Sequence, residues 1–294
     1  MTADHRRRAV RHLMSTFAVS ERRACAVVGQ PRSTQRQKPR PREDEARLVA
    51  RMLELVRAHP RFGYRRVRAR LVAEGWRVSR KRVHRLWRAN GLRVPKKVRK
   101  KRRLGSSANG CVRRRSRGKD DVWCWDSIHD RTASGGPLKW LSVVDEYTRE
   151  CVALEVRRSL RASEVVAVLE GLAQARGVPG HIRSDNGPEF IASAIREWLS
   201  GAGVGGALYV EPGSPWENGY AESFHSRLRD EFLGAEVFAS ELEARVLGAE
   251  WRRAYNHERP HSSLGYRTPA EFAAECPRFD AAEPSPNRGH EGGG

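Results

Sequence analysis

The sequence is poor in cysteine and has no long apolar run. Its five cysteines are widely scattered, and no two of them are spaced as a CxxC pair. This pattern excludes a disulfide framework and a zinc ribbon and is typical of a reduced, intracellular protein. No stretch approaches about eighteen continuous apolar residues, and the arginines near the N-terminus are not followed by the apolar core of a signal peptide. We therefore expect a cytoplasmic protein that does not enter a membrane.

Acidic residues are scarce in the first 120 residues. That part has 38 lysines and arginines against 8 aspartates and glutamates, a net charge of +30, whereas residues 121–294 have 18 against 27. A basic surface can serve solubility alone, and a GC-rich genome favours arginine. Positive charge that is concentrated in one part of the chain, as it is here, is nevertheless typical of proteins that bind nucleic acid. The acidic remainder is a candidate for metal binding.

Helical patterns fill the basic part as far as residue 94. Residues 6–40 predict three short helices in a helix-turn-helix-like order, with Ser20 as the N-cap of the second. Residues 43–94 predict three larger helices, the last capped by Ser79 and ended by Gly91. The segment that follows is dense in charge and poor in apolar residues, so it predicts a flexible basic linker.

The last helix before the linker is a candidate DNA-recognition helix. Its basic side chains are Arg80, Lys81, Arg82, Arg85 and Arg88. They could form an ordinary solvated face while Val83, Leu86 and Trp87 pack inward, but a recognition helix needs the same packed back and basic front. We predict DNA contact. The bases read cannot be inferred, because an arginine binds phosphate as well as guanine.

Three acids stand out in the acidic part. Asp126 lies in a strand-like run, and Asp185 follows a short apolar strand. Glu222 comes early in an amphipathic helix that we expect to run from about Asn218 to Phe232. Phosphodiester chemistry needs an activated oxygen nucleophile and a stabilised leaving oxygen, and two divalent cations about 3.5–4 Å apart supply both. Mg²⁺ takes only one or two protein carboxylates. Singly, the acids could be a strand-end residue, a turn residue before Asn-Gly and a solvated helix residue; together they suggest a metal site.

The motifs around these acids resemble a known family. SDNGPEF, EPGSPWENGYAESFHSRLRDE and YNHERPHSSLGYRTPAEF look like the catalytic half of transposases of the bacterial insertion-sequence-three family, relatives of retroviral integrases. VWCWDSIHDRTASG, LKWLSVVDEYTREC and VSERRACAVVGQPRSTQR are similar to the same family. The resemblance covers roughly residues 6–275. One departure is an extra residue in GVGGALYVEP, which we expect the Gly-rich loop there to absorb.

The resemblance implies a function. It makes the chain a second-frame (OrfB) protein with a DDE integrase core, a polynucleotidyl transferase that cuts one strand at each element end and joins it to DNA. Asp126, Asp185 and Glu222 would hold two Mg²⁺ ions, with Mn²⁺ as a substitute. The implied partners are element-end and target DNA, further copies of the chain on DNA, and the upstream-frame (OrfA) protein; the implied location is the bacterial nucleoid.

The fold expected is α/β, with a ribonuclease-H-like integrase core preceded by all-α DNA-binding domains. Three strands followed by strands that alternate with helices fit a mixed five-stranded sheet. Asp126 and Asp185 would then lie on adjacent strands with Glu222 on a helix beside them. The expected domains are a helix-turn-helix-like segment at 1–40, a helical DNA-binding domain at 41–94, a basic linker at 95–120, the catalytic domain at 121–276 and a disordered tail at 277–294.

Helical spacing adds further candidates. His225, Ser226 and Arg229 follow Glu222 by three, four and seven residues and so share its face. Arg229 would either lie along the DNA or pair within its helix, and both interpretations stay open; Arg227 and Arg229 complete the predicted DNA contacts. For His257 and His261 we expect a Pro-flanked, hydrogen-bonding loop rather than metal ligands or a general base.

Two other classes of function share some of these features. A catalytically silent DNA-binding regulator of the element would keep the basic helices, but the intact set of three acids speaks against it. A ribonuclease-H-like nuclease that acts on hybrids would use the same acids, but it gives no reason for two helical DNA-binding units.

Overall fold

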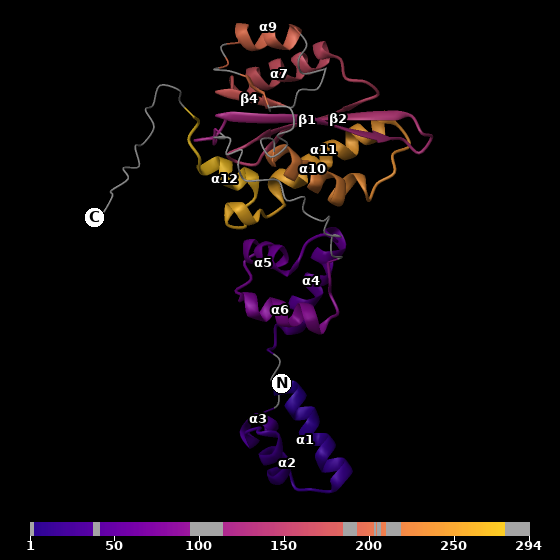
Figure 1. Ribbon diagram of the computed structural model, residues 1–294, viewed down its shortest axis with the longest axis vertical. Helices are drawn as coiled ribbons and strands as arrows, with labels where there is room; N and C mark the ends of the chain where they lie inside the picture. Colours follow the sequence, from indigo (N-terminus) through magenta and orange to yellow (C-terminus); the bar gives the residue numbers. More distant parts are fainter. Residues whose placement is uncertain are drawn as a thin grey trace, which may run out of the picture. The chain divides into compact units, whose positions relative to one another are not determined.

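The computed structural model describes residues 3–37, 42–94, 114–184, 193–202, 204, 207–209 and 219–279 (Figure 1). The chain divides into two compact units, Met1–Leu53 and Glu54–Gly294. Asp185, most of the predicted linker (95–113) and residues 280–294 lie outside the described residues. No helix in the described part is long and apolar enough to span a bilayer.

The first helices form as the sequence predicts. Ser20 accepts a hydrogen bond from the Arg23 N–H at the start of the second helix, and Gly29 ends that helix with φ +66°. Val10, Ala24 and Cys25 form their small buried core. The bounds are Ala3–Phe17 for α1, Glu21–Val28 for α2 and Arg32–Arg36 for α3.

The next helices also confirm the prediction. The Ser79 side chain accepts from the Arg82 N–H and caps the last of them. Val83, Leu86 and Trp87 are buried on that helix, so the apolar back expected of it is present. The bounds are Glu45–Ala58 for α4, Tyr64–Ala73 for α5 and Arg80–Ala89 for α6.

A mixed five-stranded sheet forms the centre of the catalytic part. Its order is β3-β2-β1-β4-β5, with β1, β2 and β3 antiparallel and β4 and β5 parallel to β1. The bounds are Val122–Arg131 for β1, Pro137–Asp145 for β2, Cys151–Arg157 for β3, His181–Ser184 for β4 and Ala207–Tyr209 for β5. The predicted sheet is confirmed.

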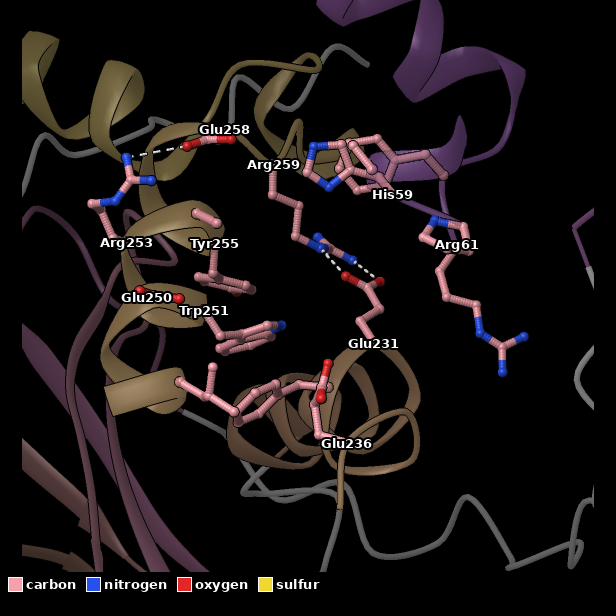
Figure 2. A pocket seen from close by; sticks show the side chains of 16 residues that line it. His59, Arg61, Glu231, Glu236, Glu250, Trp251, Arg253, Tyr255, Glu258 and Arg259 are labelled. Carbon is pink, nitrogen blue, oxygen red and sulfur yellow. Dashed lines mark hydrogen bonds and ion pairs between the residues drawn. The ribbon is translucent and has the colours of Figure 1, made fainter. Parts of the chain in front are cut away.

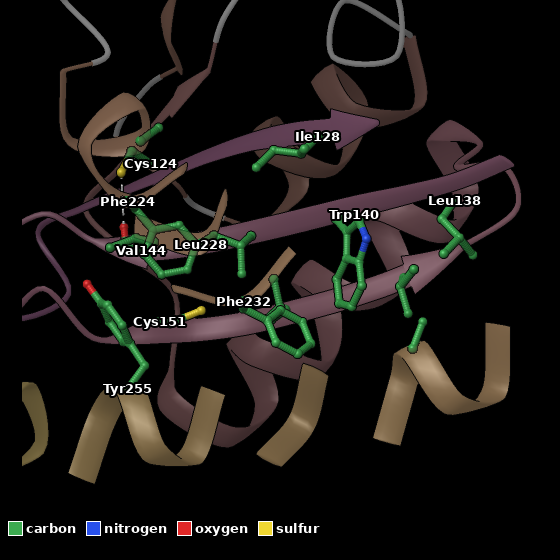
Figure 3. Packing of buried hydrophobic residues seen from close by; sticks show 14 of the residues in the cluster. Cys124, Ile128, Leu138, Trp140, Val144, Cys151, Phe224, Leu228, Phe232 and Tyr255 are labelled. Carbon is green, nitrogen blue, oxygen red and sulfur yellow. Dashed lines mark hydrogen bonds between the residues drawn. The ribbon is translucent and has the colours of Figure 1, made fainter. Parts of the chain in front are cut away.

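Helices cover both faces of this sheet (Figure 1). Because strand side chains alternate, Trp123 and Trp125 enter one core with residues of α7 and α9, whereas Cys124 and Ile128 enter the other with residues of α10 and α11 (Figure 3). The bounds are Ala162–Arg176 for α7, Ser193–Gly201 for α9, Gly219–Leu228 for α10, Glu241–His257 for α11 and Pro269–Glu275 for α12.

The helix that carries Glu222 ends differently from the prediction. The sequence predicts one helix to residue 232, but α10 passes at Leu228 into a π-helical turn, Arg229–Leu233. The Gly234 N–H donates to the Arg229 carbonyl at 2.8 Å. A π turn is a recognised interruption of α-helices. Here it buries Phe232, which packs against Trp140.

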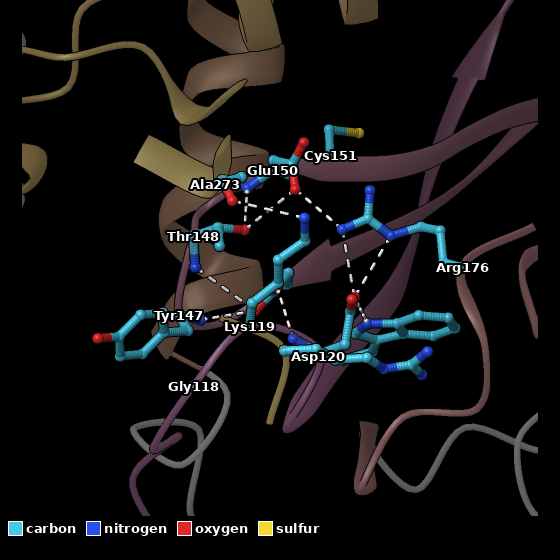
Figure 4. A network of polar contacts seen from close by, with 12 residues as sticks. Gly118, Lys119, Asp120, Tyr147, Thr148, Glu150, Cys151, Arg176 and Ala273 are labelled. Carbon is cyan, nitrogen blue, oxygen red and sulfur yellow. Dashed lines mark hydrogen bonds and ion pairs between the residues drawn. The ribbon is translucent and has the colours of Figure 1, made fainter. Parts of the chain in front are cut away.

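A buried polar network fixes the chain where it enters β1 (Figure 4). The Asp120 carboxylate accepts from Trp123 Nε1 at 2.9 Å and forms an ion pair with Arg176 of α7 at 3.2 Å. Arg176 also pairs with Glu150 at 2.9 Å, and the Asp120 N–H donates to Asp145. The end of the predicted linker is thus tied to the sheet.

Residues 277–279 are also tied down. Arg278 forms a bridge with Lys119, and the Phe279 N–H donates to the Lys119 carbonyl at 2.8 Å. These residues belong to the segment that the sequence predicts as a disordered tail. They pair because the chain entering the sheet offers them a backbone partner.

Candidate active site

Asp126 lies near the middle of β1 on the face that α10 covers. It shares this face with Cys124 and Ile128, two residues to either side. Its Oδ1 accepts from the Ser127 N–H at 2.7 Å, and its side chain is 19% exposed. The carboxylate is therefore fixed at one oxygen and still open to solvent.

A histidine that the sequence places on the face of Glu222 connects α10 to Asp126. His225 Nδ1 lies 3.2 Å from Asp126 Oδ2, and His225 Nε2 lies 2.8 Å from the hydroxyl oxygen of Ser142 on β2. Each ring nitrogen of His225 thus has an oxygen partner, the Asp126 carboxylate at Nδ1 and the Ser142 hydroxyl at Nε2. Local sequence patterns assign His225 no role, because both of its partners, Asp126 and Ser142, are distant in the sequence.

Glu222 lies one helical turn before His225 on the same face of α10. It is exposed, whereas His225 is buried. The contact between His225 and Asp126 therefore brings the face of α10 that carries Glu222 against the strand that carries Asp126.

Asp185 follows Ser184, the last residue of β4, and lies outside the described residues. β4 runs parallel to β1, with Cys124 opposite Arg183. The expectation that the strand leading to Asp185 lies beside the strand of Asp126 is therefore confirmed, while the position of the Asp185 side chain stays a prediction.

Other acids of this domain are structural. Glu146 is buried against Arg183, with Oε1 3.1 Å from Nε, and Asp121 accepts from the Arg117 N–H at 2.7 Å. Burial raises the pKa of Asp145 to about 6, although the N–H groups of Asp120 and Tyr147 donate to it. These carboxylates are enclosed, whereas Asp126 and Glu222 are open to solvent.

The chemistry of the open donors suits a hard cation. Asp126 and Glu222 offer carboxylate oxygens, the ligands that Mg²⁺ prefers. No group of three or more possible metal ligands occurs within the described residues, and a third carboxylate from Asp185 falls outside them. A separate cavity of about 550 Å³, lined by Glu231, Trp251, Tyr255 and Arg259 among others (Figure 2), includes neither Asp126 nor Glu222.

The predicted DNA-contacting residues fall into two groups. On α6, Arg80, Lys81, Arg85 and Arg88 are exposed, and Arg82 is half-buried. Near the acids, Arg229 is exposed as the first residue of the π turn, and Arg227 is half-buried. The structure therefore leaves most of these charges at the surface.

His261 lies in a hydrogen-bonded loop, as the sequence predicts, whereas His257 is the last residue of α11 and the prediction of a loop there is wrong. Its N–H donates to the Arg267 carbonyl at 2.9 Å, and its ring Nε2 lies 3.0 Å from Arg259 Nη1. Burial, together with the charge of Arg259, lowers the pKa of His261 to about 2. A ring held neutral in this way accepts from Arg259.

Comparison with known proteins shows which family this is. The integrase core domain matches residues 116–205 and again 207–269, and an HTH-like domain matches residues 42–102. A protein of insertion element IS476 from Xanthomonas euvesicatoria, described as uncharacterized, is 39% identical over 274 residues, covering 93% of this chain and 78% of that protein. The chain belongs to the insertion-sequence-three family of transposases.

Two further relatives are more distant. The transposase InsD of insertion element IS2 from Escherichia coli is 27% identical, covering 78% of this chain and 79% of that protein. The HTLV-2 integrase catalytic core domain in complex with magnesium has a TM-score of 0.43 and 15% identity, covering 54% of this chain and 99% of that one.

This transposase is a DDE polynucleotidyl transferase of an insertion element, with a ribonuclease-H-like integrase core and an HTH-like domain. It acts on DNA. The integrase core and the similarity to a transposase favour neither the silent regulator nor the hybrid-specific nuclease.

Proposed function

We propose that Asp126, Asp185 and Glu222 are the catalytic acids of this transposase and hold two Mg²⁺ ions, which Mn²⁺ can replace. The observation that carries the proposal is the 3.2 Å contact between His225 Nδ1 and Asp126 Oδ2. This contact docks the Glu222 face of α10 onto β1, and the neighbouring strand β4 leads into Asp185.

Cleavage and joining are the same displacement at phosphorus. The oxygen of water or of a DNA 3′-hydroxyl forms a bond to phosphorus, the bond to the leaving oxygen breaks, and no covalent link to the protein forms. Bound divalent cations activate the attacking oxygen and stabilise the leaving oxygen. The chain's own task is to hold carboxylates in place, and it does so at Asp126 through the Ser127 N–H and His225.

His225 acts as a positioning residue for Asp126. Its contact with Ser142 fixes the second ring nitrogen, so the imidazole cannot turn away from the carboxylate. Groups that orient metal ligands in this way affect metal affinity and activity about 10–100-fold when they are removed.

The basic helices supply the DNA contacts. Arg80, Lys81, Arg82, Arg85 and Arg88 on α6 bind element ends, and Arg227 and Arg229 bind DNA nearer the acids. The domain limits that we propose are 1–40 and 41–94 for the DNA-binding parts, 95–120 for the linker and 121–276 for catalysis. Copies of the chain assemble on DNA, with the upstream-frame protein as a further partner, in the bacterial nucleoid.

The test uses labelled duplex DNA from the ends of the element, incubated with the purified protein and Mg²⁺. We expect metal-dependent nicking and joining by the wild type. Glu222→Gln should lose at least about a hundredfold in rate, because a charge at the reacting centre is removed, while DNA binding persists.

If neither protein cuts, the assay is repeated with the fusion to the upstream-frame protein. Cutting by a Glu222→Gln fusion as fast as by the wild-type fusion would refute the catalytic role of Glu222. Silence of both fusions, with DNA still bound, would favour the regulator.

A further inference from the structure

A second polar cavity lies beside α10 and has no acidic lining among the described residues. Its volume is about 270 Å³. The polar side chains that line it include Arg149, Arg227, Arg259, Ser223, Ser262 and Ser263, and Arg66 of α5 adds a fourth guanidinium. Several positive charges, three hydroxyls and no carboxylate make a site for an anion.

Arg149 lines this cavity and has a strained backbone conformation. Its φ is +65°, in the left-handed region that side chains other than glycine rarely adopt. Its guanidinium carbon lies 3.7 Å from the centre of the Tyr220 ring, and its Nη1 is buried without a hydrogen-bond partner among the described residues. A fixed, buried donor that lacks an acceptor points to a ligand.

The charge of the cavity is only partly neutralised. Arg259 donates from Nε and Nη2 to Glu231, each at 2.6 Å (Figure 2). Arg66 also pairs with Glu231, at 3.4 Å, and this acid does not line the cavity. Burial alone would raise the pKa of Glu231, but the bond to Arg259 outweighs it and the pKa is lowered. Arg149 and Arg227 have no ion-pair partner in the described part of the chain, so their charges remain for a ligand.

The cavity lies on a different flank of α10 from the acid. Ser223 and Arg227 follow Glu222 by one and five residues, about 100° and 140° round the helix, whereas His225 lies about 60° to the other side. A group bound here is therefore not the one that reacts at Asp126.

We propose that this cavity binds a phosphodiester group of the DNA substrate other than the one being cut. The inference rests on the proposed function, since it takes DNA as the ligand. Arg149 and Arg227 contact the phosphate oxygens, and the serine hydroxyls donate to them. A phosphate bound on one flank of α10 fixes the position of its DNA strand. The scissile phosphate of that DNA strand lies on the other flank.

The test measures binding of element-end duplex to the full chain by fluorescence anisotropy over a range of salt concentrations. Arg149→Gln and Arg227→Gln should each reduce the magnitude of the log–log salt slope by about 0.9. The matched control is Arg245→Gln on α11, whose side chain pairs with Glu241 and does not line the cavity; its slope should equal that of the wild type.

A scan with single methylphosphonate linkages then locates the contact, because this linkage removes the charge of one phosphate. One non-scissile position should weaken wild-type binding and have no further effect on Arg149→Gln. If the unfolding transition shows that Arg149→Gln does not fold, the result for Arg227→Gln is used in its place. Unchanged slopes, or equal sensitivity of wild type and variant at every position, would overturn the proposal.

Inorganic phosphate is the alternative source of the same anion. If phosphate raises the melting temperature of the wild type but not of Arg149→Gln, while the salt slopes of the two agree, the cavity holds a free anion and the DNA assignment is wrong. These experiments measure binding and not catalysis. Their result is therefore valid even if the Glu222→Gln experiment shows that the proposed catalytic function is wrong.

Discussion

At the scale of single residues, Asp126 is oriented by neighbours from its own strand and from α10. The Ser127 N–H occupies Oδ1, and His225 lies 3.2 Å from Oδ2. His225 in turn is anchored by Ser142 of β2. A carboxylate held in this way loses little freedom when it binds a cation, so the histidine should matter for metal affinity.

His225→Ala should lower strand joining about 10–100-fold at limiting metal and raise the Mg²⁺ concentration needed for the half-maximal rate. His225→Gln, whose amide can donate to the carboxylate, should recover part of the loss. Titrations of joining rate against Mg²⁺ measure both effects, with His257→Ala at the end of α11 as the control. An alanine variant with the wild-type metal requirement would show that the contact is only structural.

At the scale of elements, α11 packs closely on the sheet at Gly248, whereas Gly171 of α7 is exposed to solvent. A Cβ on Gly248 of α11 would lie 2.6 Å from Cζ3 of Trp140, which is 1% exposed, whereas a Cβ on Gly171 of α7 would meet nothing within 4 Å. Gly248 thus allows the close approach of helix and sheet that encloses the core under α10.

Gly248→Ala should therefore destabilise the protein by about 1–3 kcal/mol through overpacking. Gly171→Ala should stabilise it by up to about 1 kcal/mol, because alanine is the better helix former at an open position. Urea unfolding of the two variants measures both. Equal shifts of the same sign would contradict the packing described for α11.

At the scale of the whole molecule, the basic first part of the chain and the acidic remainder differ in both charge and fold. The first 120 residues carry the basic excess and helices α1 to α6, and the acidic remainder builds the sheet and the helices that cover it, where the proposed catalytic acids occur. The sheet could be predicted, since Trp123 and Trp125 alternate with Cys124 and Ile128 as a strand buried on both faces requires.

The other features of the structure depend on contacts between segments that are distant in the sequence. Local sequence patterns do not encode such contacts. The contact of His225 with Asp126 joins a helix to a distant strand, and the cavity around Arg149 collects residues from four separate segments. The π turn after Leu228 also escaped prediction, because the residues of 229–233 continue a helical pattern and only packing of Phe232 against Trp140 distinguishes the two.

The central claim is that Asp126 and Asp185 are catalytic acids. The most direct test measures the rate at which a pre-cut 3′-hydroxyl end is joined to DNA in Mg²⁺. The variants compared are Asp126→Asn, Asp185→Asn and Asp130→Asn. Asp130 lies on the same strand as Asp126, four residues further on. The account predicts a loss of at least about a hundredfold for the first two variants and the wild-type rate for Asp130→Asn. Joining by Asp185→Asn at the wild-type rate would contradict it.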